Sequence, residues 1–207
     1  MLHLTELDLV RLRLVLTDFF EPFMMTQSRS GHSRLLLILA LIALATASRF
    51  LPLPPNFTAL GAIALFAGAV LPSLSVGILV VLSSMLISDL FLGFHSTLPF
   101  VYAALAATIL LGRYLLQSRK VSAGSFFSAT CGHGLLFYLV TNFGVWFSQA
   151  LYPKTFAGLV SCYVAGLPFL GNTLGSTALF SALLFGGLWL AERGIPQIRR
   201  NTVPVQS

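Results

Sequence analysis

The residue with the clearest chemical potential is Asp89, which is the only acidic residue between Pro22 and Ala191. It lies within a long apolar stretch, and a carboxylate at the centre of a bilayer costs roughly 2.5–3.5 kcal/mol. Arg49 is the basic residue at the corresponding end of a neighbouring apolar stretch. We therefore predict an Arg49–Asp89 ion pair, and two separately solvated interface charges are the alternative.

Other polar residues are predicted at the same membrane depth as this pair. Those that fall near the same end of an apolar segment are Asn56, His95, Asn142 and Asn172. The opposite half holds little beyond His133 and several Ser and Thr residues. Amides that converge at one depth are suited to hydrogen-bond a small molecule. A simpler interpretation is that Asn56 and Asn172 are helix N-caps.

One face of the segment around residue 140 combines aromatic rings with amides. The residues spaced i, i+4, i+8 and i+11 along it are Tyr138, Asn142, Trp146 and Gln149. These positions share one side of an α-helix. Rings and amides together favour a pocket for a planar molecule, although Trp146 could also be an interface aromatic. His133 is predicted to face the opposite way from Asn142, as a hydrogen-bonded packing residue.

The composition indicates that lipid surrounds most of these segments. Of the 207 residues, 57% are hydrophobic and 9% are charged, and the mean hydropathy is +0.90. A soluble domain carries roughly 25% charged residues, so this chain could not cover a water-exposed shell. The net charge of +6 is better explained by membrane topology and lipid headgroups than by nucleic acid.

Six segments are predicted to cross the membrane as helices. They are Leu35–Arg49, Phe57–Leu71, Leu74–Leu92, Leu98–Leu116, Ala123–Trp146 and Thr173–Leu190. The first two are short for spans, which usually need about 17–25 residues. Before the sixth, Ala157–Leu167 is predicted to be a short membrane-edge or re-entrant helix, because Pro168, Gly171 and Asn172 follow it. The fold class is therefore all-α, a polytopic bundle of about six transmembrane helices.

The distribution of basic residues predicts the orientation of the bundle. With the N-terminus inside, all of the 12 Lys and Arg residues except Arg49 and Lys154 lie on the cytoplasmic side. The positive-inside rule requires this kind of bias. We expect a transmembrane domain over 34–195 between two cytoplasmic tails. The first tail, 1–33, is amphipathic or disordered, and the second is 196–207.

The chain lacks the common motifs of hydrolysis and metal binding. It contains no Walker A, HExxH or GxSxG sequence, so it cannot energise transport with its own ATP hydrolysis. We predict no enzyme activity, no cofactor and no metal. A weaker hypothesis is a membrane enzyme that uses Asp89 and His95. Cys131 and Cys162 are expected to be small packing residues.

Four stretches carry a resemblance to a known family. They are Arg49–Ala69 (RFLPLPPNFTALGAIALFAGA), Ser88–His95 (SDLFLGFH), Leu139–Pro153 (LVTNFGVWFSQALYP) and Gly158–Leu174 (GLVSCYVAGLPFLGNTL). Over about residues 34–195 the chain resembles an uncharacterised bacterial family of small integral membrane proteins described as transport proteins. That family is itself similar to the substrate-binding S components of energy-coupling-factor transporters.

The resemblance implies a six-helix S-component-like fold in the bacterial cytoplasmic (inner) membrane. It also implies a pocket that opens to the outside and a partner, a transmembrane coupling subunit with two ATPases. An acidic residue is expected shortly after the NTL block, and here Leu174 is followed by GSTALF. A site that uses such an acid would be altered in this chain.

The leading hypothesis is a substrate-binding subunit for uptake of a small molecule, such as a vitamin or its precursor. Its partners are that substrate, membrane lipid and the coupling subunit, with no nucleic acid. The expected substrate-binding residues are Arg49, Asn56, Asp89, Tyr138, Asn142, Trp146, Tyr163 and Asn172. The alternative is a membrane scaffold without a small-molecule site, using the small-residue pairs Ala43–Ala47 and Ala64–Gly68.

Overall fold

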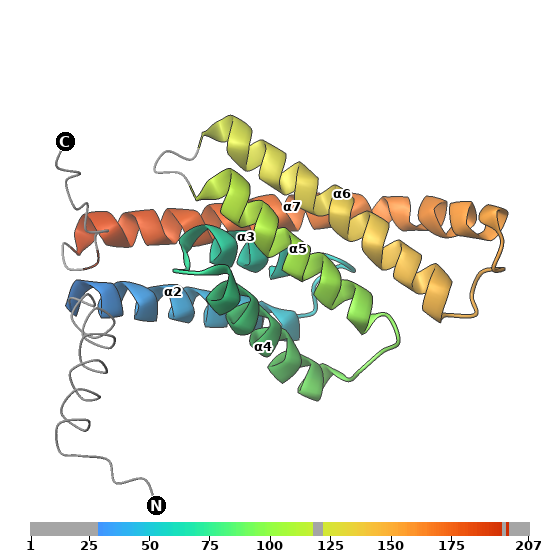
Figure 1. Ribbon diagram of the computed structural model, residues 1–207, viewed down its shortest axis with the longest axis horizontal. Helices are drawn as coiled ribbons and strands as arrows, with labels where there is room; N and C mark the ends of the chain where they lie inside the picture. Colours follow the sequence, from blue (N-terminus) through green and yellow to red (C-terminus); the bar gives the residue numbers. More distant parts are fainter. Residues whose placement is uncertain (1–28, 118–121, 196–197, 199–207) are drawn as a thin grey trace, which may run out of the picture. The chain divides into compact units, whose positions relative to one another are not determined.

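A computed structural model describes residues 29–117, 122–195 and 198, and the described chain is all helical (Figure 1). The elements are α2 (Arg29–Ala47), the 3-10 helix η1 (Ser48–Phe50), α3 (Leu60–Val70), α4 (Leu74–Leu92), α5 (Leu98–Leu116), α6 (Ala123–Ser148) and α7 (Phe156–Gly194). The two predicted tails lie largely outside the described residues. Helix α2 begins at Arg29, within the range predicted as the N-terminal tail.

Five of these helices are long and apolar enough to cross a membrane, and α3 is the short one. The protein is therefore a polytopic α-helical membrane protein. Helices α4 and α5 have the predicted bounds of the third and fourth spans, and α6 extends the fifth span by two residues to Ser148. Residues 38–190 form one compact unit, and residues 29–37 with 191–195 and 198 belong to a second.

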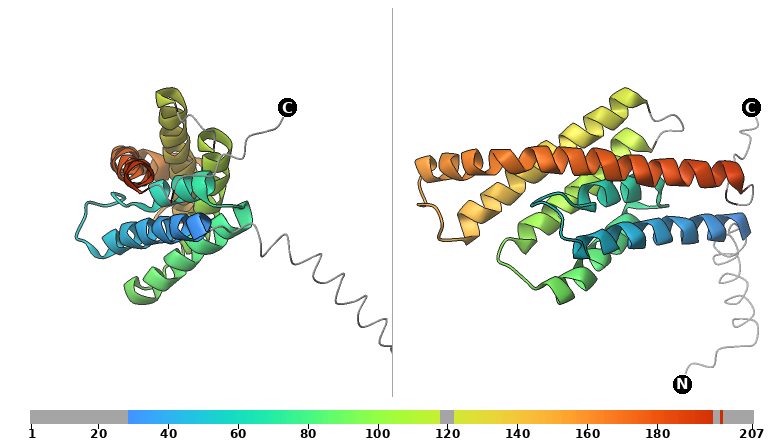
Figure 2. Two further views of the ribbon diagram at one scale, coloured as in Figure 1. Left: turned by 90° about the vertical axis from the view of Figure 1, so that its left-hand side faces the viewer. Right: turned by 180° about the vertical axis from the view of Figure 1, so that it is seen from behind.

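Helix α3 is the centre of the larger unit. Every residue from Leu60 to Ala69 is buried, and Figures 1 and 2 show α3 enclosed by longer helices. Eleven residues rise only about 16 Å, roughly half of a bilayer's hydrocarbon core. A helix this short is tolerated in the membrane because its neighbours, rather than lipid, surround it.

Two glycines bring the backbones of α3 and α5 together. A Cβ at Gly68 would overlap the carbonyl oxygen of Ile109, and a Cβ at Gly112 would overlap that of Leu65. The small-residue pair Ala64–Gly68 is thus used for packing inside the bundle.

Helix α7 corrects the prediction of a broken last segment. It runs without interruption over 39 residues with Pro168 inside it, so neither a separate helix over 157–167 nor a break at Gly171 and Asn172 exists. The physical reason is that lipid rather than water surrounds this segment. A break within the membrane would leave several backbone groups without water, whereas proline inside a helix removes one hydrogen bond.

Local capping explains where α4 and α6 begin and where α4 ends. The Ser73 hydroxyl accepts a hydrogen bond from the Val76 N–H (3.2 Å), and Ser122 forms a capping box with Ser125. Helix α4 ends at Leu92, and its C-cap is Gly93. The φ of Gly93 is 94°, a backbone conformation that residues with a Cβ rarely adopt.

An ion pair joins the first and last described segments within the smaller unit. Arg34 Nε donates to Glu192 Oε1 at 2.9 Å, so the start of α2 lies beside the end of α7.

The contact between α3 and α5 predicts a steep cost for one added methyl group. We expect Gly68→Ala to lower the free energy of unfolding by about 1–3 kcal/mol, because the helices must separate or distort. Thermal unfolding in detergent, followed by tryptophan fluorescence, measures this. Gly186→Ala is the matched control, since a Cβ there meets open space. Equal melting temperatures for the two variants would contradict the packing described.

Candidate functional site

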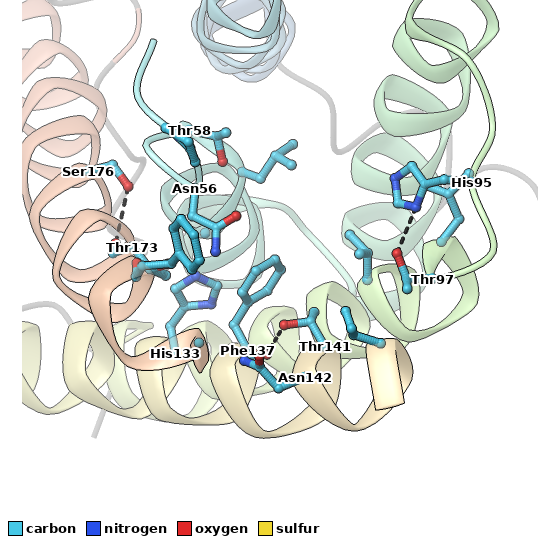
Figure 3. A pocket seen from close by; sticks show the side chains of 18 of the residues that line it. Asn56, Thr58, His95, Thr97, His133, Phe137, Thr141, Asn142, Thr173 and Ser176 are labelled. Atoms are coloured by element: carbon cyan, nitrogen blue, oxygen red, sulfur yellow. Dashed lines mark hydrogen bonds between the residues drawn. The ribbon is translucent and has the colours of Figure 1, made fainter. Parts of the chain in front are cut away.

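A cavity of about 490 Å³ lies within the larger unit. It is lined by Arg49, by residues 55–61, by Met85 of α4, by residues 95–101, by residues 133–145 of α6, by Tyr152 and by residues 162–177 of α7. Figure 3 shows His95 and Thr97 on one side of this space, and Asn56, His133 and Thr173 toward the other. In the predicted orientation most of this lining lies in the outer half of the membrane, and the cavity reaches inward to His133.

Three of the eight predicted binding residues line the cavity: Arg49, Asn56 and Asn142. Asp89 is tied to the cavity through Arg49. The other four, Tyr138, Trp146, Tyr163 and Asn172, are outside the lining, and each donates a hydrogen bond to a backbone carbonyl.

The predicted Arg49–Asp89 ion pair is present. Arg49 Nη2 donates to Asp89 Oδ1 at 2.7 Å, and the Asp89 side chain is 1% exposed. A second guanidinium nitrogen, Nη1, donates to the hydroxyl of Ser88 and contacts the Met85 carbonyl at 3.4 Å. The arginine thus satisfies a buried carboxylate and, at the same time, forms part of the cavity wall.

Tyr102 is a member of this cluster that the sequence did not single out. Its hydroxyl donates to Asp89 Oδ2 at 2.8 Å, so both carboxylate oxygens are bound. The hydrogen bond joins α4 to α5. The signal in the sequence is weak, because Tyr102 lies 13 residues beyond Asp89 and the turn between the two helices decides whether they meet.

Asn56 owes its position to a tight turn rather than to a helix cap. The Phe57 N–H donates to the Pro54 carbonyl at 2.9 Å, and Asn56 has a φ of 61°. Proline followed by a residue with positive φ is typical of a type II turn, and asparagine tolerates that conformation. The N-cap of α3 is Ala59, so the helix-cap interpretation of Asn56 is wrong.

Asn142 lies between α6 and α7. Its Nδ2 donates to the Tyr138 carbonyl at 2.8 Å, and its Oδ1 lies so close to Gly166 that a Cβ there would overlap it. The amide is thus held in place, with one of its two N–H hydrogens already used.

Tyr138 and Tyr163 join the same two helices. Tyr138 donates to the Tyr163 carbonyl at 2.6 Å, Tyr163 donates to the Leu139 carbonyl at 2.8 Å, and the ring centroids are 5.6 Å apart. These reciprocal hydrogen bonds fix the spacing of the wall that α6 and α7 form.

Trp146 lies in the last turn of α6 and contacts the connection between α6 and α7. Its Nε1 donates to the Pro153 carbonyl at 2.9 Å, and the Lys154 ammonium lies 5.5 Å from its ring centroid. Lys154 also donates to the carbonyls of Trp146, Phe147 and Gln149 at the end of α6. The lysine therefore caps the negative end of that helix.

Asn172 is an interior residue of α7, so the prediction that it is an N-cap is wrong. Its Nδ2 donates to the Pro55 carbonyl at 2.9 Å. This hydrogen bond ties α7 to the turn that presents Asn56.

His133 is hydrogen-bonded and buried, as predicted, but it also lines the cavity with Asn142. His133 and Asn142 are nine residues apart, on opposite sides of α6, and both still reach the cavity because its lining covers a wide arc of this helix. Residues 133, 137, 141 and 145 rotate by about 40° at each step toward Asn142. His95 hydrogen-bonds Thr97 at 2.7 Å, whereas Asp89 is occupied by Arg49 and Tyr102.

The bundle and its cavity define a polytopic membrane protein with a cavity lined by both apolar and polar side chains. Over residues 29–198 the chain matches the model of a family described as Family of unknown function (DUF6580), and the chain belongs to that family. No curated protein and no solved structure matches the chain. The family description carries no substrate and no link to S components.

The Arg49–Asp89 pair predicts a stability effect for charge removal. Asp89→Asn leaves a partly buried guanidinium without its carboxylate, so we expect a loss of roughly 3–5 kcal/mol. Thermal unfolding in detergent measures the change. The double variant Arg49→Met/Asp89→Leu should lose clearly less free energy of unfolding than Arg49→Met and Asp89→Leu lose together. Additive losses would show that the two charges do not interact.

Proposed function

We propose that this protein binds a small molecule in the outer half of the membrane and takes part in its uptake. The observation that carries the proposal is the cavity itself, a space of about 490 Å³ inside a membrane bundle. Small-molecule sites commonly have about 300–1,000 Å³. Polar groups at membrane depth are costly and are retained mainly where they act on a substrate or a partner.

The lining supports recognition rather than passive packing. Hydroxyls, amides and the Arg49 guanidinium alternate with the rings of Phe137, Tyr152 and Phe169. Apolar walls with a few fixed polar groups are the usual construction of a binding site. Tyr138, Tyr163, Trp146 and Asn172 then act as positioning residues, because they fix the elements that carry the lining.

Energy for transport would come from a partner. The chain has no Walker A sequence, and the resemblance to S components suggests a coupling subunit with ATPases in the bacterial inner membrane. In that arrangement the loaded bundle changes orientation when its partner hydrolyses ATP. The scaffold alternative needs an exposed small-residue surface for a protein partner. Ala64 and Gly68 are buried in α3, so only Ala43 and Ala47 of the two predicted pairs are exposed.

The proposed orientation predicts which loops are reached from outside the cell. In a background without Cys131 and Cys162, we expect Ser96→Cys to react with a membrane-impermeant maleimide in intact cells. Ser122→Cys, in the loop on the other side, should react only after the membrane is opened. The reverse pattern would show that the cavity lies toward the cytoplasm.

Filling the cavity should remove any retained molecule. The full-length protein, gently purified from its own membranes, is analysed by native mass spectrometry, and we expect a stoichiometric small-molecule adduct. Ala165→Phe should lose it, because residue 165 lines the cavity. Val164→Phe is the matched control, since Val164 is 59% exposed and lies outside the lining. An empty wild-type protein, or equal retention in both variants, would count against the proposal.

A further inference from the structure

We infer that the cavity selects a net-neutral molecule that carries N–H or O–H donors toward α6 and α7 and a carbonyl-type acceptor toward Asn56. This inference names the ligand chemistry of the proposed function and rests on it.

The hydroxyls of the wall made by α6 and α7 have already used their own hydrogens. The hydroxyls of Thr141, Thr173 and Thr177 donate to the carbonyls four residues earlier, at 2.7, 3.1 and 2.7 Å. Ser176 donates to the Thr173 carbonyl at 3.1 Å, and Asn142 Nδ2 uses one of its two hydrogens. A hydroxyl has one hydrogen, so these four hydroxyl oxygens can only accept further hydrogen bonds.

His133 adds one more acceptor to this wall. The Thr108 hydroxyl donates to the Ala104 carbonyl at 2.7 Å, and its oxygen lies 2.9 Å from His133 Nδ1. One hydroxyl hydrogen cannot serve both contacts, so the pairing in which Thr108 donates to the carbonyl makes Nδ1 the donor in the second contact. In the neutral ring Nε2 is then an acceptor, on the edge that faces Gly61, where no Cβ intervenes.

The turn at Asn56 supplies free hydrogen-bonding groups. Within the described part of the chain, the side chains of Asn56 and Thr58 make no hydrogen bond, and both line the cavity. An amide and a hydroxyl can each donate as well as accept. Figure 3 shows Asn56 above the His133 ring. A ligand at this turn can therefore accept a hydrogen bond from Asn56 or Thr58 while it donates to the neighbouring acceptors of α6 and α7.

The charge balance of the lining favours a neutral ligand. Arg49 is the one residue with a permanent charge among the described residues of the lining, and Asp89 neutralises it at 2.7 Å. An ion that enters would leave water without a free counter-charge, which costs several kcal/mol. Neutral donors lose much less, because the acceptors of the wall replace water.

Four molecules built on the same phenyl ring test this inference on the purified full-length chain. Benzamide is neutral, with two N–H donors and one acceptor. N,N-dimethylbenzamide lacks the donors, benzoate is an anion, and benzamidinium is a donor-rich cation. Binding is measured as the concentration-dependent rise in melting temperature. We expect benzamide to bind at least about tenfold more tightly than the other three, as the loss of one or two hydrogen bonds implies.

A double variant assigns the preference to the wall. Thr141→Val/Thr177→Val removes two acceptors with little change in shape, and it should weaken benzamide binding about tenfold or more. Thr46→Val is the matched control, because Thr46 makes the same hydrogen bond to a carbonyl four residues earlier and lies outside the lining. Equal losses in the two would overturn the assignment.

Retained material separates this inference from the proposed function. A charged molecule found by native mass spectrometry, or tighter binding of benzoate, benzamidinium or the dimethyl compound, would overturn the inference and leave a binding protein. Weak benzamide binding equal to that of the other three would also overturn it. No retained molecule and no binding of any of the four would remove the proposed function as well.

Discussion

The close approach of α3 and α5 is the constraint on which the rest of the structure depends. The glycines at 68 and 112 let each backbone lie against a carbonyl of the other helix. A helix too short to span the bilayer can then stay at the centre of the bundle, shielded from lipid. Because α3 is short, it does not fill the depth of the bundle. The space beyond its N-terminus at Leu60 holds the 51–59 segment and the cavity.

The cavity occupies the space that the short helix α3 leaves, and fixed connections hold the elements around it. The turn at Asn56 enters above α3, and Asn172 holds this turn against α7. On the other side, Tyr138 and Tyr163 set the spacing of α6 and α7, while Lys154 fixes the loop that joins them. The cavity is therefore bounded by elements that are each held by a side-chain hydrogen bond to a backbone carbonyl.

The sequence predicted what depends on local pattern. The bounds of α4 and α5 follow from continuous apolar runs between Pro72, Gly93 and polar turns. The Arg49–Asp89 pair could be predicted because so few charged residues lie at the ends of the apolar segments. It failed where packing decides. Pro168 breaks a helix in water but not in lipid, and Tyr102 joins Asp89 only because the 93–97 turn returns α5 beside α4. Helical spacing predicts Trp146 as a pocket residue, but its ring lies beside the Lys154 ammonium and its Nε1 donates to the Pro153 carbonyl.

Pro168 has a mechanical consequence for the cavity. Proline cannot donate to the carbonyl of Val164, so α7 lacks one rung of its hydrogen-bond ladder beside Ala165 and Gly166, which both face the cavity. Bending is cheapest where a rung is missing. A change of bend at this point would alter the width of the cavity and would leave the packing of α3 on α5 unaffected.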